Sequence, residues 1–289
     1  MKTEMKRWTQ LGLGVALAGS VALASCGGSE PDQAVSSDAP ASSESAMTDA
    51  PDDTTDADIS APTVTAEGGE GEGGVAVEQA ATDPVVFRSA LAITEAHILA
   101  ARDAFAAGEI SAAGEMFAHP VSEVLLDVGP YLDMHGVENF DQLLLDASAA
   151  CFEDDTTAED IAERTKEIIA TLRAAAEKAP DDGSSEAHIQ VSVAADQIDR
   201  AATMYGIAGD SDAYEPYLDG YGFYLAAQNA FRMEKAAIEE EYPEAAKAIR
   251  QAFKALGNAY PTAERPEPLP GNAAALTGAA SAVILAIGD

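Results

Sequence analysis

The chain has 289 residues, with 50 Asp and Glu against 16 Lys and Arg, and its formal net charge is −34. Such an acidic surface repels phosphate backbones and anionic headgroups, which argues against nucleic-acid binding and favours cations as small partners. Solubility in a salty setting would explain the same charge. The charge is uneven, because residues 27–83 hold 14 acids and no Lys or Arg. This composition shift predicts one folded domain, at 84–289.

The first 25 residues have the pattern of an export signal. Three basic residues lie within the first seven positions, and an apolar stretch follows at 11–24. That stretch is too short to span a bilayer as a mature helix, which needs about 20 residues. It ends in Leu23-Ala24-Ser25-Cys26, a small-residue cleavage site that closes on cysteine.

This tetrad resembles the lipobox of bacterial lipoproteins. The resemblance implies a signal peptide at 1–25, cleavage before Cys26, and lipid attached to the Cys26 thiol and amine. Gly27, where an Asp would favour retention in the inner membrane, implies the periplasmic face of the outer membrane. Several acyl chains on one residue give stable anchoring. Ordinary secretory cleavage, with a free Cys26, is the alternative.

Residues 26–83 are rich in Ser, Ala, Asp, Thr, Gly and Pro and show no apolar periodicity. Such a segment buries too little surface to offset its ordering entropy, so it is predicted to be a disordered acidic tether. Cys151, the other cysteine, lies beside apolar residues and is expected to be a small buried side chain.

From residue 84 onward the apolar spacing is helical. Stop signals, capping patterns and prolines divide this part of the chain into the expected helices. They cover residues 84–107, 109–136, 137–152, 156–178, 186–206, 213–241, 243–260 and 273–287.

No stretch shows the alternation of a strand, so we expect an all-α domain, an antiparallel bundle of about seven helices behind the tether. Its 206 residues are enough for a sizeable core. The last helix is apolar but too short to span a bilayer, and core packing is its expected role.

The segment 115–135 concentrates groups that could carry chemistry. It holds two of the four histidines, several carboxylates and two prolines. On an unbroken helix Glu115, His119 and Glu123 would share one face. Pro120 favours a second geometry, in which a new helix starts at the proline and His119 lies at the junction, with Glu123 and Asp127 on successive turns.

Either geometry places an imidazole near carboxylates, and mixed nitrogen and oxygen ligands suit iron, zinc or copper. The expected ligands are His119, Glu123, His97, Glu115 and Asp127. His97 enters the set because a hairpin between the first two helices would bring it near His119. The alternatives are a His119 packed at a helix bend and a His97 partly exposed on its helix.

The remaining polar features have plainer explanations. His135 lies in a helix C-terminal turn, where a cation is favoured, and His188 near a helix start is expected at the surface. The aromatic run 214–224 could form a ligand wall or a tyrosine-carboxylate iron site, but core packing with hydroxyls at the rim is the preferred interpretation. Two glycines in this run, Gly220 and Gly222, predict a kink.

An exported, helical, acidic domain with His and Glu near a helix start resembles the imelysin and EfeO group of periplasmic iron-uptake proteins. That group has a His-x-x-Glu motif, and the nearest match here is His119-Pro-Val-Ser-Glu123, one residue longer. The stretch 217–221 also resembles periplasmic segments of bacterial iron permeases. The resemblance implies metal or haem handling at the cell envelope without catalysis.

Two functions therefore remain open. The first is a lipid-anchored envelope protein that binds a metal ion or haem, plausibly iron, and passes it to an envelope transport protein. The second is a structural or protein-interaction lipoprotein whose helices offer a docking surface. An enzyme is not expected, because the sequence has neither Gly-x-Ser-x-Gly nor His-Glu-x-x-His.

Overall fold

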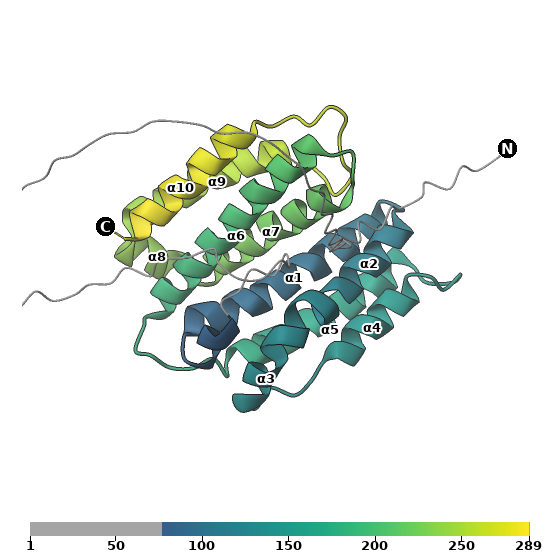
Figure 1. Ribbon diagram of the computed structural model, residues 1–289, viewed down its shortest axis with the longest axis horizontal. Helices are drawn as coiled ribbons and strands as arrows, with labels where there is room; N and C mark the ends of the chain where they lie inside the picture. Colours follow the sequence, from purple (N-terminus) through teal and green to yellow (C-terminus); the bar gives the residue numbers. More distant parts are fainter. Residues whose placement is uncertain (1–76, 289) are drawn as a thin grey trace, which may run out of the picture. The chain divides into compact units, whose positions relative to one another are not determined.

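The computed structural model describes residues 77–288, and these residues fold as an all-α protein, as the sequence predicts. The expected lipidation site Cys26 and the part of the expected tether up to residue 76 lie outside the described residues. The helices, labelled in Figure 1, are α1 (Pro84–Ala106), α2 (Ile110–Pro120), α3 (Leu126–Met134), α4 (Asp141–Ala150), α5 (Ala158–Ala176), α6 (Glu186–Asp210), α7 (Glu215–Met233), α8 (Lys235–Glu241), α9 (Pro243–Ala259) and α10 (Ala273–Ile287).

Helix α1 is the central element, and it packs against α2, α5, α6 and α7 (Figure 1). Asp83 caps its N-terminus by accepting hydrogen bonds from the backbone N–H groups of Val85 (2.8 Å) and Val86 (3.2 Å). Pro84 holds the first helical position, where a missing N–H costs little. Within residues 77–288, α1 is the helix whose length and composition would let it cross a membrane, but 83% of that window is buried inside the bundle.

The folded part begins before the expected residue 84. Val77–Ala81 form a short 3-10 helix, η1, in which Ala80 is fully buried. The imidazole Nε2 of His135, at the end of α3, lies 2.9 Å from the carbonyl oxygen of Ala81. This contact ties η1 to the bundle.

All the expected helices are present, and two of them are divided. The segment 109–136 comprises α2, a π-helical turn η2 (Val121–Leu125) and α3, while 213–241 comprises α7 and α8. Pro120 is the last residue of α2. Because proline has no N–H to donate, it interrupts the hydrogen-bond ladder of the helix, and the chain widens into the π-turn directly after it.

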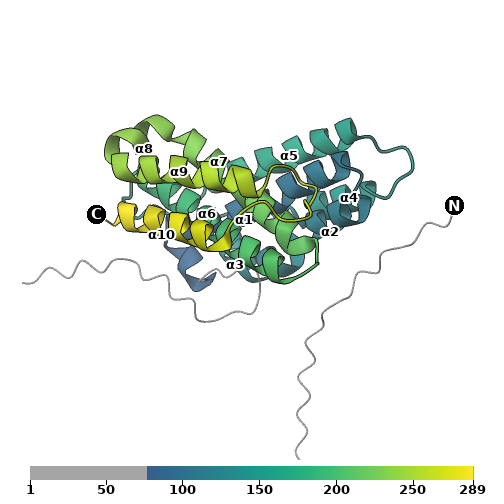
Figure 2. The same ribbon diagram turned by 90° about the horizontal axis from the view of Figure 1, so that it is seen from above.

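The C-terminal helix packs on the bundle through one face only, so the expected core packing is confirmed for that face. Helices α9 and α10 run beside each other, and α10 also contacts α6 (Figures 1 and 2). The buried side chains of α10 are Leu276, Ala280 and Val283, whereas Leu285 faces outward.

A kink was expected at Gly220 and Gly222, and α7 continues as one helix through both. Both glycines instead allow close approach. A Cβ on Gly222 would lie 2.4 Å from the carbonyl oxygen of Ala96 on α1, and a Cβ on Gly220 would lie 1.9 Å from the hydroxyl oxygen of Tyr260. The missing side chain at Gly222 lets α7 press against α1 at backbone distance, and the missing side chain at Gly220 makes room for Tyr260.

We expect Gly222→Ala to lower the free energy of unfolding by about 2 kcal/mol, because the added methyl group would force α1 and α7 apart. Urea denaturation followed by circular dichroism measures the change. Gly278→Ala is the matched control, because a Cβ on Gly278 in α10 would meet nothing within 4 Å. The control should be neutral or stabilising by up to about 1 kcal/mol. Equal stability of both variants would contradict the proposed close approach.

Candidate metal centre

Three helices that meet in the bundle each contribute one potential metal ligand. His97 comes from α1, His119 from α2 and Asp219 from α7, and one ligand atom of each lies within 4.8 Å of the others (Figure 1 shows the three helices). The imidazole rings of His97 and His119 are 6.1 Å apart, centre to centre. The expected approach of the two histidines across the α1 and α2 hairpin is thus confirmed.

His97 is buried and its tautomer is fixed. Its Nδ1 lies 2.8 Å from the carbonyl oxygen of Ile93, which can only accept, so Nδ1 carries the proton. Burial, together with the charges of His119 and Arg200, lowers the pKa of His97 to about 4, although the hydrogen bond to Ile93 acts in the opposite direction. The ring is therefore neutral at pH 7, and Nε2 presents an unprotonated lone pair to the cluster.

Carboxylate oxygens face this lone pair. Oδ1 of Asp219 is 3.7 Å and Oε2 of Glu123 is 3.9 Å from Nε2 of His97. These distances are too long for hydrogen bonds, and Nε2 makes none. A buried acceptor atom without a hydrogen-bond donor is unfavourable, and a proton or a cation held between Nε2 and these oxygens would relieve it.

The spacing suits an ion. Two ligand atoms at about 2.1 Å from a tetrahedral metal are about 3.4 Å apart. The pair His97 and Asp219, at 3.7 Å, is already close to that spacing, whereas the three ligand atoms, within 4.8 Å of one another, would have to draw together around an ion.

His119 presents a different nitrogen to each side. Its Nδ1 is buried, makes no hydrogen bond and lies 3.9 Å from Oε1 of Glu123. Its Nε2 lies 3.7 Å from Oε1 of Glu215, the first residue of α7. A metal-bound histidine usually donates its second ring N–H to a carboxylate, and Glu215 is placed to accept it. The geometry therefore favours Nδ1 as the ligand atom of His119.

The prolyl bend sets the relation between His119 and Glu123. His119 precedes Pro120 at the end of α2, and Glu123 lies in the π-turn that follows. A π-turn takes more residues per turn than an α-turn and is frequent at functional sites. Across it the two side chains, four residues apart, remain on one face.

The structure separates the five expected ligands. His97, His119 and Glu123 come together. Glu115 is not in the group of three potential ligands. Burial raises the pKa of Glu115, the charge of His119 opposes the rise, and Glu215 adds to it. Asp127 is exposed and is not part of the cluster. Asp127 is therefore removed from the candidate set, since the chain turns it toward solvent after the π-turn.

Sequence reasoning missed Asp219 and Glu215 as members of the site. Asp219 is buried and lies on α7 four residues before Phe223, whose ring meets that of His97 edge to face at 5.8 Å. The sequence did contain a sign of this role, because an acid at an inward position of an aromatic helix is unusual. Asp219 was not singled out because the run 214–224 was interpreted as one unit.

The tyrosines of the run 214–224 pack in or against the core, as the preferred interpretation of the sequence predicts. Tyr217 is fully buried, and its hydroxyl donates to the carbonyl oxygen of Thr262 at 2.7 Å. Tyr221 donates to the Asp103 carboxylate at 2.8 Å. Burial raises the pKa of both hydroxyls. Protonated hydroxyls already engaged in this way do not suit a tyrosine-carboxylate iron site.

The remaining isolated groups also have structural partners. His188, expected at the surface, is part-buried, and its Nδ1 lies 3.2 Å from the hydroxyl oxygen of Tyr242. Cys151 is buried, as expected, and its thiol donates to the carbonyl oxygen of Ala147. Burial raises the pKa of this thiol to about 11, so it is neither a nucleophile nor a ready ligand.

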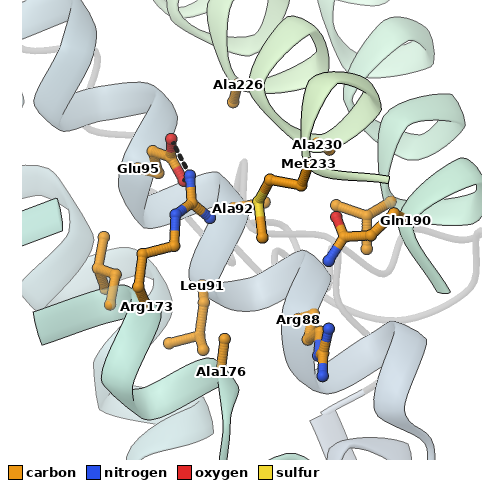
Figure 3. A pocket seen from close by; sticks show the side chains of 12 residues that line it. Arg88, Leu91, Ala92, Glu95, Arg173, Ala176, Gln190, Ala226, Ala230 and Met233 are labelled. Carbon is orange, nitrogen blue, oxygen red and sulfur yellow. Dashed lines mark hydrogen bonds and ion pairs between the residues drawn. The ribbon is translucent and has the colours of Figure 1, made fainter. Parts of the chain in front are cut away.

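A second buried polar cluster lies on the other face of α1. Glu95 and Arg173 line a small cavity and contact each other directly at its edge (Figure 3), with 2.6 Å between Arg173 Nη2 and Glu95 Oε1. Asn229 donates to the same oxygen at 2.7 Å. The cavity measures about 20 Å³, enough for about one water molecule. This cluster is satisfied and joins α1, α5 and α7.

Comparison with known proteins adds no relative. No family model matches the chain, and neither the curated proteins nor the solved structures gave a match. The geometry of the site carries the functional argument.

The pKa of His97 predicts how the stability of the metal-free protein depends on pH. The unfolded chain takes up a proton at His97 near pH 6.5, whereas the folded protein does so only near pH 4. Stability should be constant in this respect above pH 6.5 and fall as the pH drops from 6.5 to 4, by roughly 3 kcal/mol.

Urea denaturation at several pH values tests this slope. His97→Asn is the comparison, because its amide retains a donor for the Ile93 carbonyl but does not titrate. The slope between pH 6.5 and 4 should be smaller in the variant. Parallel slopes in the two proteins would mean that His97 is not held neutral by burial.

Proposed function

We propose that this chain is a lipid-anchored cell-envelope protein that binds one first-row transition metal ion and passes it on without catalysis. His97, His119 and Asp219 are the proposed ligands, with Glu123 completing the set. The observation that supports this most directly is the unprotonated Nε2 of His97, held in the core opposite carboxylate oxygens.

The donor set favours certain ions. Two imidazoles with one or two carboxylates suit non-haem Fe(II) and zinc, whereas softer copper(I) prefers sulfur ligands. Because the ligand atoms lie within 4.8 Å of one another, they suit a single ion. A haem plane between the two histidines would have to occupy the place of the carboxylates, so a bare ion is the better proposal.

The proposed location rests on the N-terminal sequence. The lipobox at Cys26 implies lipid attachment at the periplasmic face of the outer membrane, and the acidic stretch that follows would act as a tether. A tethered metal carrier needs a recipient, and an envelope transport protein is the proposed partner. A docking lipoprotein without a metal remains the competing function.

Metal affinity tests the proposal. The full chain, freed of metal by a chelator, should take up one equivalent of Zn²⁺ or Fe²⁺ in a calorimetric titration. Asp219→Asn should weaken binding roughly 100-fold or more, because losing a ligand costs more than the 10–100-fold typical of outer partners.

His188→Ala is the matched control, because it removes a histidine that lies outside the cluster and contacts Tyr242. It should bind as the unaltered protein does. Absence of stoichiometric binding by the unaltered, folded chain would overturn the metal proposal and favour docking.

The anchor has its own test. Cys26→Ser should abolish incorporation of labelled palmitate and move the protein from the membrane fraction to the soluble fraction, since lipid attachment requires that thiol. Cys151→Ser, which changes the buried cysteine, should leave both unaltered. Membrane association that persists in the Cys26 variant would exclude lipidation as the anchor.

A further inference from the structure

The side chains of the cluster differ in their exposure to solvent. The side chains of Asp219 and His97 are 0% and 1% exposed, that of His119 is 18% exposed, and those of Glu123 and Glu215 are 28% and 37% exposed. Exposure therefore rises from the α1 and α7 contact toward the N-terminal end of α7. An ion reaching the core ligands would pass His119 and the glutamates.

The outer side of His119 is rich in carboxylates. Glu215 faces Nε2 of His119 at 3.7 Å. Glu115, one turn before His119 on α2, is part-buried and is close enough to both residues for their charges to act on it. Two helices thus bring carboxylates to the rim of the site.

These acids differ from an ordinary acidic surface because a buried nitrogen without a hydrogen bond lies on the inner side of His119. Nε2 of His97, in a side chain that is 1% exposed, makes no hydrogen bond and points into the cluster. His119 stands between the rim and this atom, with one ring nitrogen on each side. The rim therefore leads to a buried donor atom.

We propose that Glu215 and Glu115 form a capture site for hydrated divalent cations, from which an ion moves past His119 to the inner ligands. This inference rests on the proposed metal-binding function and adds the direction of entry. Both acids retain contact with solvent, so they would hold an ion that still carries part of its water shell. The inner set would replace that water with nitrogen and oxygen ligands.

The two sets of residues should act on different rate constants. Carboxylates gathered at an entrance raise the local concentration of cations and speed association. The buried ligands act mainly on dissociation, because they bind the ion after it has lost water. A capture site is therefore visible in the association rate constant even when the affinity changes little.

Stopped-flow mixing of the full chain with Co²⁺ measures this rate, because the ligand-field absorption of Co²⁺ reports entry into the inner site. Glu215→Gln combined with Glu115→Gln should slow association about tenfold and reduce its dependence on ionic strength. The final Co²⁺ spectrum should stay that of the unaltered protein. Because Glu215 also faces Nε2 of His119, the dissociation rate constant should rise, but by a smaller factor than the fall in association.

Glu244→Gln is the matched control. It removes one negative charge in the first turn of α9, where Glu244 pairs with the exposed Lys247. It should leave association unchanged. If the double variant associates as fast as this control, the capture site is overturned while the metal centre stands. If the unaltered chain takes up no Co²⁺, the metal centre itself fails.

A measurement on the unaltered protein guards against misfolded variants. Association of Co²⁺ should slow as ionic strength rises from 10 mM to 300 mM NaCl, because salt screens the rim carboxylates. A rate that is independent of salt would overturn the proposal whatever the variants show.

Discussion

The close approach of α1 and α7 is the constraint on which the candidate site depends. Because Gly222 has no side chain, the backbone of α7 reaches the carbonyl oxygen of Ala96. His97 is the next residue on α1, and Asp219 lies three residues before Gly222 on α7. A wider separation would leave room for water between these two side chains, and their opposed polar atoms would lose the low-dielectric surroundings that make an ion favourable.

Burial and tautomer together convert His97 from a core residue into a potential ligand. A buried histidine is often satisfied at both nitrogens. Here the Ile93 carbonyl engages Nδ1, while Nε2 makes no hydrogen bond and lies 3.7 Å from Oδ1 of Asp219. Protein interiors seldom leave such an atom unpaired without a reason. Glu95, on the same helix as His97, is the contrasting case, because the opposite charge of Arg173 on α5 satisfies it.

The sequence predicts local features better than contacts between residues that are far apart in the chain. Helical periodicity, prolines and caps locate the helices, and the hairpin places His97 near His119. Asp219 was not predicted because it lies about 120 residues from His97, and only the packing of α7 on α1 brings them together. The two glycines were interpreted through their effect on one helix, whereas their role concerns the contact between two. The prediction of Asp127 as a metal ligand is wrong for a related reason, because a π-turn changes which face of the helix the later residues occupy.

The position of a bound ion tests the account most directly. Crystals of the protein grown with Zn²⁺ and measured at the zinc absorption edge would give an anomalous difference map. The account predicts one strong peak about 2.0–2.2 Å from Nε2 of His97, Nδ1 of His119 and a carboxylate oxygen of Asp219. A fully occupied zinc bound elsewhere, with these side chains unchanged, would contradict it.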